Sequence, residues 1–330
     1  MISLSKPTMN LCARLLGRVF TGPEMNSISP VVFFTYNRPL HTEQAIFHLL
    51  QNAEARRTPL FIFSDGAKDN RAEAQVTAVR KILRKIAGFK SVQLTQRSGN
   101  LGLANSIISG VTEILKTFES VIVLEDDITV SKNFLSYMNK ALNQYRLNPK
   151  VASIHGWNFP LQEKNLPDTF FLRGADCWGW ATWKRAWNEF EPDGDKLLMQ
   201  LESQNLFNQF DLDGAYPYTQ MLKDQIAGKN NSWAIRWHAS MFLRDKVTLH
   251  PGKSLVQNIG LDGSGVHTGQ AKAYQTQLSQ KRELQFPPEV VENEKMRKII
   301  IAYLRKNHGP RFIPHLKSKI RTWVSQLKDL

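Results

Sequence analysis

The stretch VIVLEDD, residues 121–127, is an apolar β-strand pattern that ends in three adjacent carboxylates. Like charges crowded at a strand end repel one another, and they are tolerated when a cation or a ligand neutralises them. Open α/β sheets bind their ligands outside the carboxyl ends of the strands. The stretch therefore predicts a divalent metal site at the carboxyl edge of an α/β sheet.

The three carboxylates cannot all face one ion, because successive side chains of a strand point in opposite directions. We expect Asp127 to bind the metal, and Glu125 and Asp126 to face the ribose and the sugar of a nucleotide-sugar. Oxygen ligands suit Mn²⁺ or Mg²⁺, and such an ion would neutralise a diphosphate leaving group. The same geometry argues against a glycosidase, whose two carboxyls face each other across one bond. The structural alternative is an acidic strand end in solvent.

Strand and helix patterns alternate from residue 30 to residue 155. The alternation predicts an α/β fold with a Rossmann-like, mostly parallel sheet and helices on both faces. Two more strands end in polar residues: Asn37 and Arg38 follow one, and Asp65 follows the next. We expect Arg38 to pair with a phosphate or a base carbonyl. Asp65 suits a base or a ribose, although Asp65-Gly66 is also a common turn pair.

The second half of the chain is irregular and aromatic. Four tryptophans lie within residues 178–187, and the spacing of those at 180, 183 and 187 predicts one face of a helix that packs in the core. Trp178 and Trp180 stand at the expected start of that helix, and Trp233 belongs to a second cluster at 232–237. We expect these three as a platform for a sugar ring.

His267 lies in the glycine-rich segment GSGVHTG, residues 263–269. We expect it to reach the metal or a phosphate when this loop closes, although a lone loop histidine is also often merely exposed. Glycine-rich phosphate motifs do not follow the early strands, which disfavours dinucleotide dehydrogenases and P-loop enzymes. A nucleotidylyltransferase remains an alternative, but it would be expected to carry glycines where residues 36–39 read Tyr-Asn-Arg-Pro.

The chain has 330 residues, a formal net charge of +14 and two cysteines, Cys12 and Cys177. So few cysteines, far apart, favour a reducing compartment. Neither an apolar run long enough to span a bilayer nor a convincing signal peptide is visible, so we expect a cytoplasmic protein. We expect no nucleic-acid partner, because no binding module is recognisable.

Three parts are expected along the chain. A basic lead-in covers 1–28, and one compact domain covers 29–270, with a nucleotide half at 29–155 and an acceptor half at 156–270. Residues 271–330 would be a linker followed by a basic amphipathic helical tail. From Lys295 onward, ten Lys and Arg stand against one acidic residue. Such a tail suits an anionic membrane surface and peripheral binding, or else a helix pair packed on the domain with a solvated basic face.

The residues also resemble a known family, the N-acetylglucosaminyltransferase I family of A-type-fold glycosyltransferases. The likeness covers residues 30–269 in the order of its motifs, and the Glu-Asp-Asp metal motif is the most specific of them. The matching positions are Arg38, Ser64-Asp65, residues 123–130 and 133–137, Gly156-Trp157-Asn158, Gly179-Trp180, Pro251, Ser254 and residues 265–269.

The resemblance implies an inverting transfer from a UDP-sugar, with Mn²⁺ held by Asp127. It implies that Asp126 lies near the ribose, Glu125 near the donor sugar, and Arg38 and Asp65 near the nucleotide. The family's general base is an aspartate just before a tryptophan block. Aligned on Trp233, that position holds Asn231, which cannot accept a proton, so Asp224 is the expected substitute.

We therefore predict a metal-dependent glycosyltransferase that uses a nucleotide-sugar donor and a glycan or lipid-linked acceptor. Without an expected membrane anchor and with a basic tail, the chain resembles a bacterial enzyme of surface polysaccharide or lipopolysaccharide synthesis, acting at the inner face of the plasma membrane. Asn231 favours a second reading, a non-catalytic carbohydrate- or membrane-binding protein on the same fold.

Overall fold

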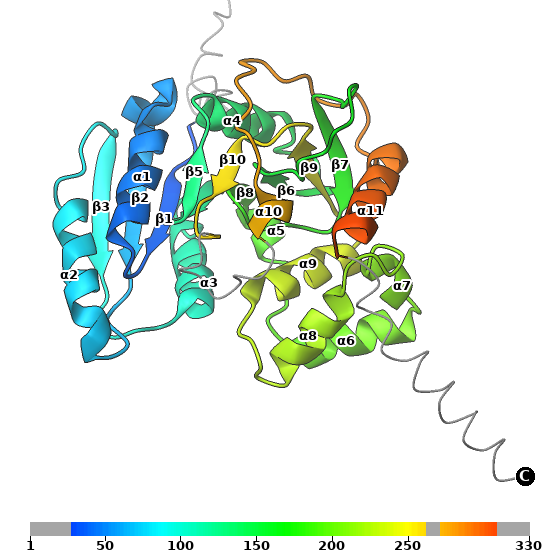
Figure 1. Cartoon of the computed structure of the whole chain (residues 1–330), viewed down its shortest axis with the longest axis horizontal. Helices are drawn as coiled ribbons and strands as arrows, with labels where there is room; N and C mark the ends of the chain where they lie inside the picture. Colours follow the sequence, from blue (N-terminus) through cyan, green and yellow to red (C-terminus); the bar gives the residue numbers. More distant parts are fainter. Residues whose placement is uncertain (1–27, 262–270, 309–330) are drawn as a thin grey trace, which may run out of the picture.

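An eight-stranded sheet forms the centre of the molecule, in the strand order β3-β2-β1-β4-β8-β6-β9-β7 (Figure 1). The computed structural model describes residues 28–261 and 271–308. Strands β7 and β8 run against the other six, which are parallel to one another. This confirms the predicted α/β fold. The strands are β1 (Val31–Thr35), β2 (Pro59–Ser64), β3 (Ser91–Gln96), β4 (Ser120–Glu125), β6 (Val151–His155), β7 (Thr169–Arg173), β8 (Trp180–Trp183) and β9 (Val247–Pro251).

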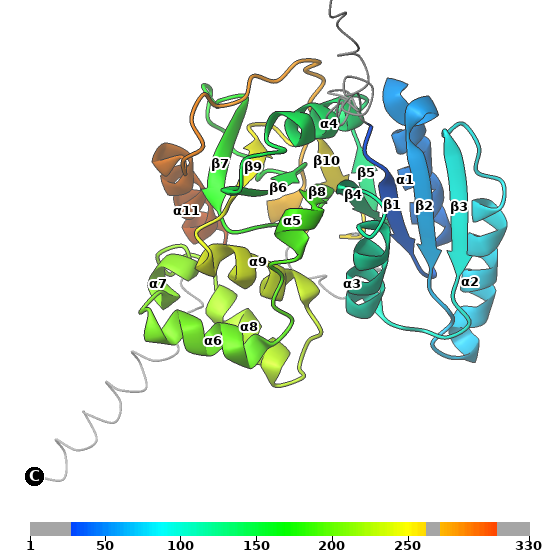
Figure 2. The same ribbon diagram turned by 180° about the vertical axis from the view of Figure 1, so that it is seen from behind.

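Helices cover both faces of this sheet, as the strand–helix alternation predicts (Figures 1 and 2). The apolar sides of α1 (Pro39–Leu50), α2 (Asn70–Leu83) and α4 (Phe134–Gln144) pack in one core. The other core is formed by α3 (Leu103–Ile114) and α9 (Trp233–Leu243). Because both faces are covered, the central strands are mostly apolar, and every residue of β1 is buried. Shorter helical pieces are η1 (Ala53–Arg57) and α5 (Lys184–Trp187).

Local chemistry explains where these helices begin. Pro39 opens α1, where its missing N–H and its fixed φ cost nothing. Asp69 caps α2 by accepting hydrogen bonds from the backbone N–H groups of Arg71 and Ala72. The same sequence signals end the preceding strands, so β1 and β2 present their last residues at one edge of the sheet.

The segment around Trp180 is a strand, not the predicted helix. Residues Trp180–Trp183 form β8, between β4 and β6, and only the next four residues are helical. In a strand, side chains three positions apart face opposite sides. Trp180 therefore lies in one core and Trp183 in the other.

A small two-stranded ribbon extends from the acidic end of β4. The chain turns at Asp126 and Asp127 into β5 (Ile128–Val130), which pairs antiparallel with β10 (Val256–Asn258). The ribbon joins the end of the nucleotide half to a segment more than 120 residues later.

A helical layer lies beyond α9, on the lower side of the sheet in Figure 1. Its helices pack around a separate core that contains Leu197, Leu222 and Phe242. They are α6 (Gly194–Ser203), α7 (Phe207–Phe210) and α8 (Tyr218–Ile226).

The segment expected to be a linker packs against the domain. After α10 (Ala271–Tyr274), the Phe286 ring contacts Tyr137 and Tyr145, and Asn293 N donates to Phe171 O at 2.8 Å. The helix α11 (Glu294–His308) then buries Met296, Ile300 and Leu304 against Phe170. The chain up to residue 308 therefore adds to the domain core.

Other expectations fall outside the described residues: the lead-in 1–27, the loop that holds His267, and the tail from residue 309. In the part of the chain that the structure describes, no helix is both long enough and apolar enough to cross a bilayer.

Candidate active site

The three carboxylates of the VIVLEDD stretch lie where β4 ends, and each has a different environment. Glu125 is the last residue of β4, and Asp126 and Asp127 form the turn that follows. The Asp126 carboxylate accepts from Thr35 Oγ1 at 3.0 Å and from Tyr36 N at 3.1 Å, so it is turned toward the end of β1. Asp127 Oδ2 accepts from Arg38 Nη1 at 3.0 Å. The turn thus spreads the charges over three directions.

Burial raises the pKa of all three acids, and repulsion between carboxylates adds to this for two of them. Burial raises the pKa of Glu125 well above its ordinary value, and the charges of Asp127 and Asp126 raise it further. Burial also raises the pKa of Asp126, to about 6, with a contribution from Asp127. The pKa of Asp127 is raised by burial and drawn back by Arg38. Negative charge therefore exceeds the positive charge that Arg38 supplies, and this is the condition under which a bound cation is stabilising.

Gly260 covers the Asp127–Arg38 pair from the turn after β10. Ile259 N donates to the backbone oxygen of Asp127 at 2.8 Å, which holds the chain over the turn. A Cβ at position 260 would collide with Asp127 Oδ2 and would lie 2.9 Å from Arg38 Nη1. The backbone approaches this closely because residue 260 has no side chain. Nothing in the sequence around Gly260 marks it as part of the site.

The other residues expected to bind nucleotide lie near the same edge. Asn37 is half-buried in the turn between β1 and α1, next to Arg38. Asp65 is buried, and its carboxylate accepts from Gly66 N, Leu101 N and Gly102 N at 2.9–3.1 Å. The Asp65 oxygens thus hold the segment before α3, in keeping with a turn role, and its contact with a base or ribose stays a prediction.

Two of the three expected sugar platforms are core residues. Trp180 is fully buried and stacks on Trp233 with ring centroids 5.2 Å apart. Neither ring has a face open to a ligand, so this expectation is wrong for both. Trp178 is only half-buried, and its ring meets Trp157 edge-on at 4.9 Å and Tyr274 at 5.7 Å.

Asp224, the expected substitute base, lies on α8 in the helical layer. Its carboxylate accepts from Gln220 Nε2 at 3.0 Å and pairs with Lys229 Nζ at 3.2 Å. These contacts stay within one turn of its own helix and the loop after it. Asn231 is exposed just before Ser232, which caps α9 by accepting from Ile235 N. The described contacts do not connect Asp224 with Glu125.

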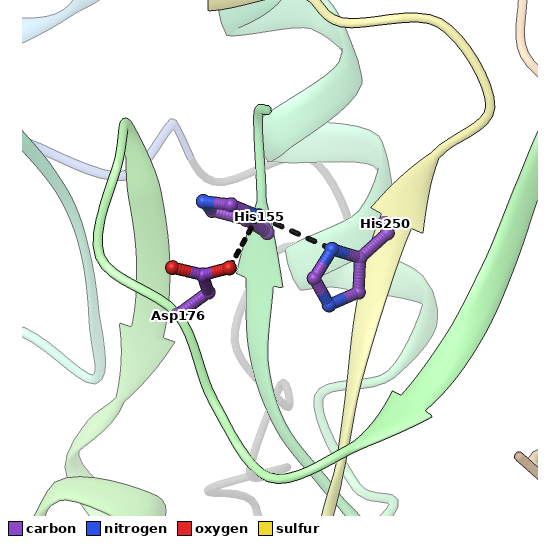
Figure 3. Close-up of side chains that lie close together, drawn as sticks. All are labelled: His155, Asp176 and His250. Carbon is purple, nitrogen blue, oxygen red and sulfur yellow. Dashed lines mark hydrogen bonds and ion pairs between the residues drawn. The ribbon is translucent and has the colours of Figure 1, made fainter. Parts of the chain in front are cut away.

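A second polar group at the same edge of the sheet was not predicted. His155 ends β6, His250 lies in β9, and Asp176 comes from the segment between β7 and β8 (Figure 3). His155 Nδ1 lies 3.2 Å from His250 Nδ1 and 3.6 Å from Asp176 Oδ2. Each residue offers a ligand atom, and these atoms lie within 4.8 Å of one another. A general signal existed in the sequence, since both histidines stand where apolar strands end.

The hydrogen bonds of this group suit neutral imidazoles and do not suit a metal. Trp178 N donates to His155 Nε2 at 3.2 Å, so Nε2 carries a lone pair and Nδ1 carries the proton. A metal on Nδ1 would require a proton on Nε2, which would then face the Trp178 N–H. Burial lowers the pKa of His155 and of His250 to about 3 each, so both rings stay neutral. His155 Nδ1–H therefore donates to His250 Nδ1.

Comparison with known proteins assigns the chain to a family. A model of the GNT-I family matches residues 13–197, more than half of the chain. An alpha-1,3-mannosyl-glycoprotein 2-beta-N-acetylglucosaminyltransferase of Arabidopsis thaliana is 24% identical over 180 residues, which are 51% of this chain and 40% of that protein. The chain thus spans well under half the length of this curated relative.

Two solved structures show a partial likeness to this chain. The mannosyltransferase PcManGT from Pyrobaculum calidifontis, in complex with GDP-Man and Mn²⁺, is 14% identical with a TM-score of 0.31, over 42% of this chain and 38% of that one. S. aureus TarS is 11% identical with a TM-score of 0.35, over 50% and 30%. The match of the family model confirms the resemblance seen in the motifs: the chain belongs to the GNT-I family of glycosyltransferases.

Proposed function

We propose that the protein transfers a sugar from a nucleotide-sugar, a UDP-sugar in the first instance, to a hydroxyl of a glycan or lipid-linked acceptor, with inversion. The observation that carries the proposal is the turn at Asp126 and Asp127, where burial raises the pKa of three adjacent acids, repulsion raises that of Glu125 and Asp126 further, and one arginine pairs with Asp127. This excess of negative charge fits a divalent cation together with an anionic diphosphate.

Each residue of the turn has a proposed role. Asp127 would hold Mn²⁺ or Mg²⁺, which when bound supplies Lewis-acid neutralisation of the leaving diphosphate. Arg38 then serves the phosphates as well as Asp127, because its guanidinium is partly exposed. Asp126 keeps the end of β1 in place and faces the ribose side, and Glu125 faces the donor sugar. His267 is proposed as a further metal or phosphate ligand from the loop outside the described residues.

The place of action is proposed from the charge of the C-terminal part. On α11 the apolar side is buried in the domain, while Lys295, Lys298, Arg305 and Lys306 are exposed. A basic face of this kind, continued by the basic residues after 308, is attracted to anionic lipid. We therefore place the protein peripherally at the inner face of a bacterial plasma membrane, in surface polysaccharide or lipopolysaccharide synthesis. Binding to anionic vesicles that weakens with added salt, and is weaker on neutral vesicles, is the expected result.

The central test is ligand-dependent stability. The melting temperature would be measured with UDP, GDP and their sugar conjugates, each with and without Mn²⁺. A ligand that binds only the folded state raises stability by RT ln(1 + [L]/Kd), about 2.7 kcal/mol at a hundred times Kd. We expect one nucleotide series to stabilise the wild type in the presence of Mn²⁺, and the Asp127→Asn variant to lose this stabilisation.

Glu202→Gln is the matched control, because Glu202 is an exposed acid on α6. It should respond like the wild type. If the wild type responds to no nucleotide with either ion, the proposal is wrong. If nucleoside triphosphates yield pyrophosphate, the protein is instead a nucleotidylyltransferase. If nucleotide-sugars bind but are never cleaved, the non-catalytic alternative holds.

A further inference from the structure

The inference rests on the proposed function and concerns its second substrate. When a sugar is transferred to a hydroxyl, the hydroxyl proton needs an acceptor within reach of the reacting oxygen. Asn231 offers none, and the contacts of Asp224 lie within the helical layer. Asp176 is the carboxylate that the fold places beside the acidic turn without making it part of that turn.

The register of the sheet places Asp176 beside the turn. Trp180 in β8 pairs with Val123 in β4 on one side and with His155 in β6 on the other. Residues paired across strands project from the same face, and so do residues two apart on one strand. Glu125, Trp180 and His155 therefore point to the same side of the sheet. Two strand spacings separate β4 from β6, which is about 10 Å.

The segment 174–179 enters β8 between these two strands and is fixed there. Gly179 O accepts from Gly156 N at 2.7 Å, and a Cβ at Gly179 would meet Val256 Cγ1 at 2.7 Å and Ile128 Cγ2 at 3.4 Å. Gly179 thus packs directly on the ribbon formed by β5 and β10. Because that ribbon begins at Asp127, the segment lies next to the acidic turn.

Cys177 lies close both to Asp176 and to the acidic turn. Burial raises the pKa of its thiol, and the charges of Asp176, Glu125 and Asp127 each raise it further. One half-buried residue is thus close enough to feel the charge of Asp176 and of two acids of the turn. This agrees with the placement from the strand register.

The Asp176 side chain is held by a hydrogen bond at one oxygen and is partly exposed. Oδ1 accepts from Cys177 N at 2.8 Å, while Oδ2 lies 3.6 Å from His155 Nδ1, which is too far for a strong hydrogen bond. His155 is fully buried, but 37% of the Asp176 side chain is exposed. Burial on its inner side raises the pKa of Asp176. Such a carboxylate is oriented by its neighbours and still accessible to a ligand.

The surroundings indicate what ligand would reach it. The half-buried Trp178 ring follows two residues later and packs against Tyr274, and Tyr216 and Tyr218 lie close enough to feel the Asp176 charge. Aromatic rings with polar tips beside a carboxylate are suited to a saccharide, whose apolar faces stack while its hydroxyls bond.

We propose that Asp176 is the catalytic base that accepts the proton of a saccharide acceptor hydroxyl, with His155, His250 and the Cys177 N–H as its positioning groups. The acceptor oxygen gives its proton to Asp176 Oδ2 and forms a bond to the anomeric carbon of the donor. The bond from that carbon to the diphosphate oxygen breaks, and its electron pair leaves on the nucleoside diphosphate.

The experiment measures nucleoside diphosphate release from UDP-N-acetylglucosamine and UDP-glucose with Mn²⁺, in water and with methyl mannoside or methyl glucoside as acceptors. Water is a valid acceptor, because it gives its proton to the same base. Asp176→Asn is expected to lower kcat by about 10²–10⁴-fold while nucleotide-dependent stabilisation stays as in the wild type. Glu202→Gln is the control, and Asp224→Asn tests the rival base.

Two readouts separate a base from a structural residue. Formate should restore part of the turnover of Asp176→Ala, because a small carboxylate can occupy the space of the lost one. In the wild type, kcat should fall as the pH drops through the raised pKa of Asp176, and this acid limb should be missing in Asp176→Asn. The titratable groups that face Asp176 are His155, His250, His238, Cys177, Tyr216, Tyr218 and Tyr274.

Undiminished turnover by Asp176→Asn, or loss in Asp224→Asn alone, overturns the assignment while the proposed function stands. If Zn²⁺ without nucleotide stabilises both the wild type and Asp127→Asn but not His250→Ala, the group is a metal site and the assignment is also wrong. If the wild type releases no diphosphate from either donor in any mixture, the proposed function fails, and this inference fails with it.

Discussion

The turn after β4 and the group around His155 lie at the same edge of one sheet, yet their electrostatics are opposite. In the turn, three acids stand next to one another and burial raises the pKa of each. In the second group, burial keeps two histidines neutral beside a single carboxylate. The turn carries excess negative charge and favours a bound cation. The group around His155 has neutral imidazoles and hydrogen bonds of its own, so it needs no added ion. The difference separates the proposed donor side from the proposed acceptor side.

The largest expected effect comes from removing one acid on each side. Asp127→Asn should lower sugar transfer by roughly 10³-fold, since a metal ligand supplies several kcal/mol of charge stabilisation. It should also abolish stabilisation by nucleotide, whereas Asp176→Asn should lower kcat and leave that stabilisation as in the wild type. Melting curves with nucleotide and initial rates on the same samples make the comparison. Equal loss of nucleotide binding in both variants would show that the two regions form one site.

Trp180 lies between the two regions, and its loss should affect both through stability. Trp180→Ala should lower the free energy of unfolding by about 3–5 kcal/mol, because a large buried ring leaves a cavity. Trp178→Ala should cost much less stability and should instead raise the KM for a saccharide acceptor. Urea unfolding and acceptor titrations measure the two effects. A large stability loss for Trp178→Ala with unchanged KM would contradict the acceptor role.

The two regions should respond to pH with opposite signs. An acid whose pKa is raised by folding destabilises the native state at high pH, so stability is gained as the pH falls through about 6 for Asp126. A histidine whose pKa is lowered by folding costs stability as the pH falls below its ordinary value of 6.5. Asp126→Asn should therefore remove a gain on acidification worth at most roughly 3 kcal/mol. His250→Gln should instead remove a loss of stability on acidification.

Melting temperatures between pH 4.5 and 7 in the absence of nucleotide test this pair of signs. Relative to the wild type, the curve of Asp126→Asn should rise more steeply with pH and that of His250→Gln less steeply. Shifts in the same direction for both variants would show that the two environments do not differ as described.

The smallest expected effect concerns the covering of the turn. Gly260→Ala forces a methyl group against Asp127 Oδ2 and Arg38 Nη1, so the pair must shift. Overpacking of this kind costs about 1–3 kcal/mol, and nucleotide binding should weaken while the Asp176 side is unaffected. Gly99→Ala is the matched control, because a Cβ there meets nothing within 4 Å. Wild-type nucleotide affinity in Gly260→Ala would mean that the pair plays no part in binding.

The two regions also differ in how far they can be predicted from the sequence. The three acids of the turn are adjacent in the sequence, so an apolar strand pattern followed by three acidic residues is enough to predict the site. His155 and His250 come from two strands and Asp176 from the connection between β7 and β8; only the sheet order brings them together, and no local spacing shows that order. The sequence predicts a helix where Trp180–Trp183 is a strand, because short apolar runs fit either period and burial on both faces removes the alternation of a strand.

Two further differences have similar causes. Trp233 and Trp180 were expected to face a ligand, but an aromatic cluster in sequence does not reveal which rings cover each other in the core. The segment 275–293 has the polar and proline-rich composition of a linker, yet a few apolar residues such as Phe286 suffice to attach it to the sheet. Composition gives the mean polarity of a segment, whereas packing against the core depends on individual side chains.

The reversed direction of β8 has a consequence for how such a protein can change. In a wholly parallel sheet, every chain segment at the carboxyl edge leaves a strand. Here two segments enter strands at that edge, and the one that enters β8 lies between β4 and β6. On the proposals above, the segments that leave β1 and β4 serve the donor, and the segment that enters β8 serves the acceptor. Substitutions at Trp178 would then alter acceptor choice while Asp176 stays in place, which makes this position the natural target for engineering new linkages.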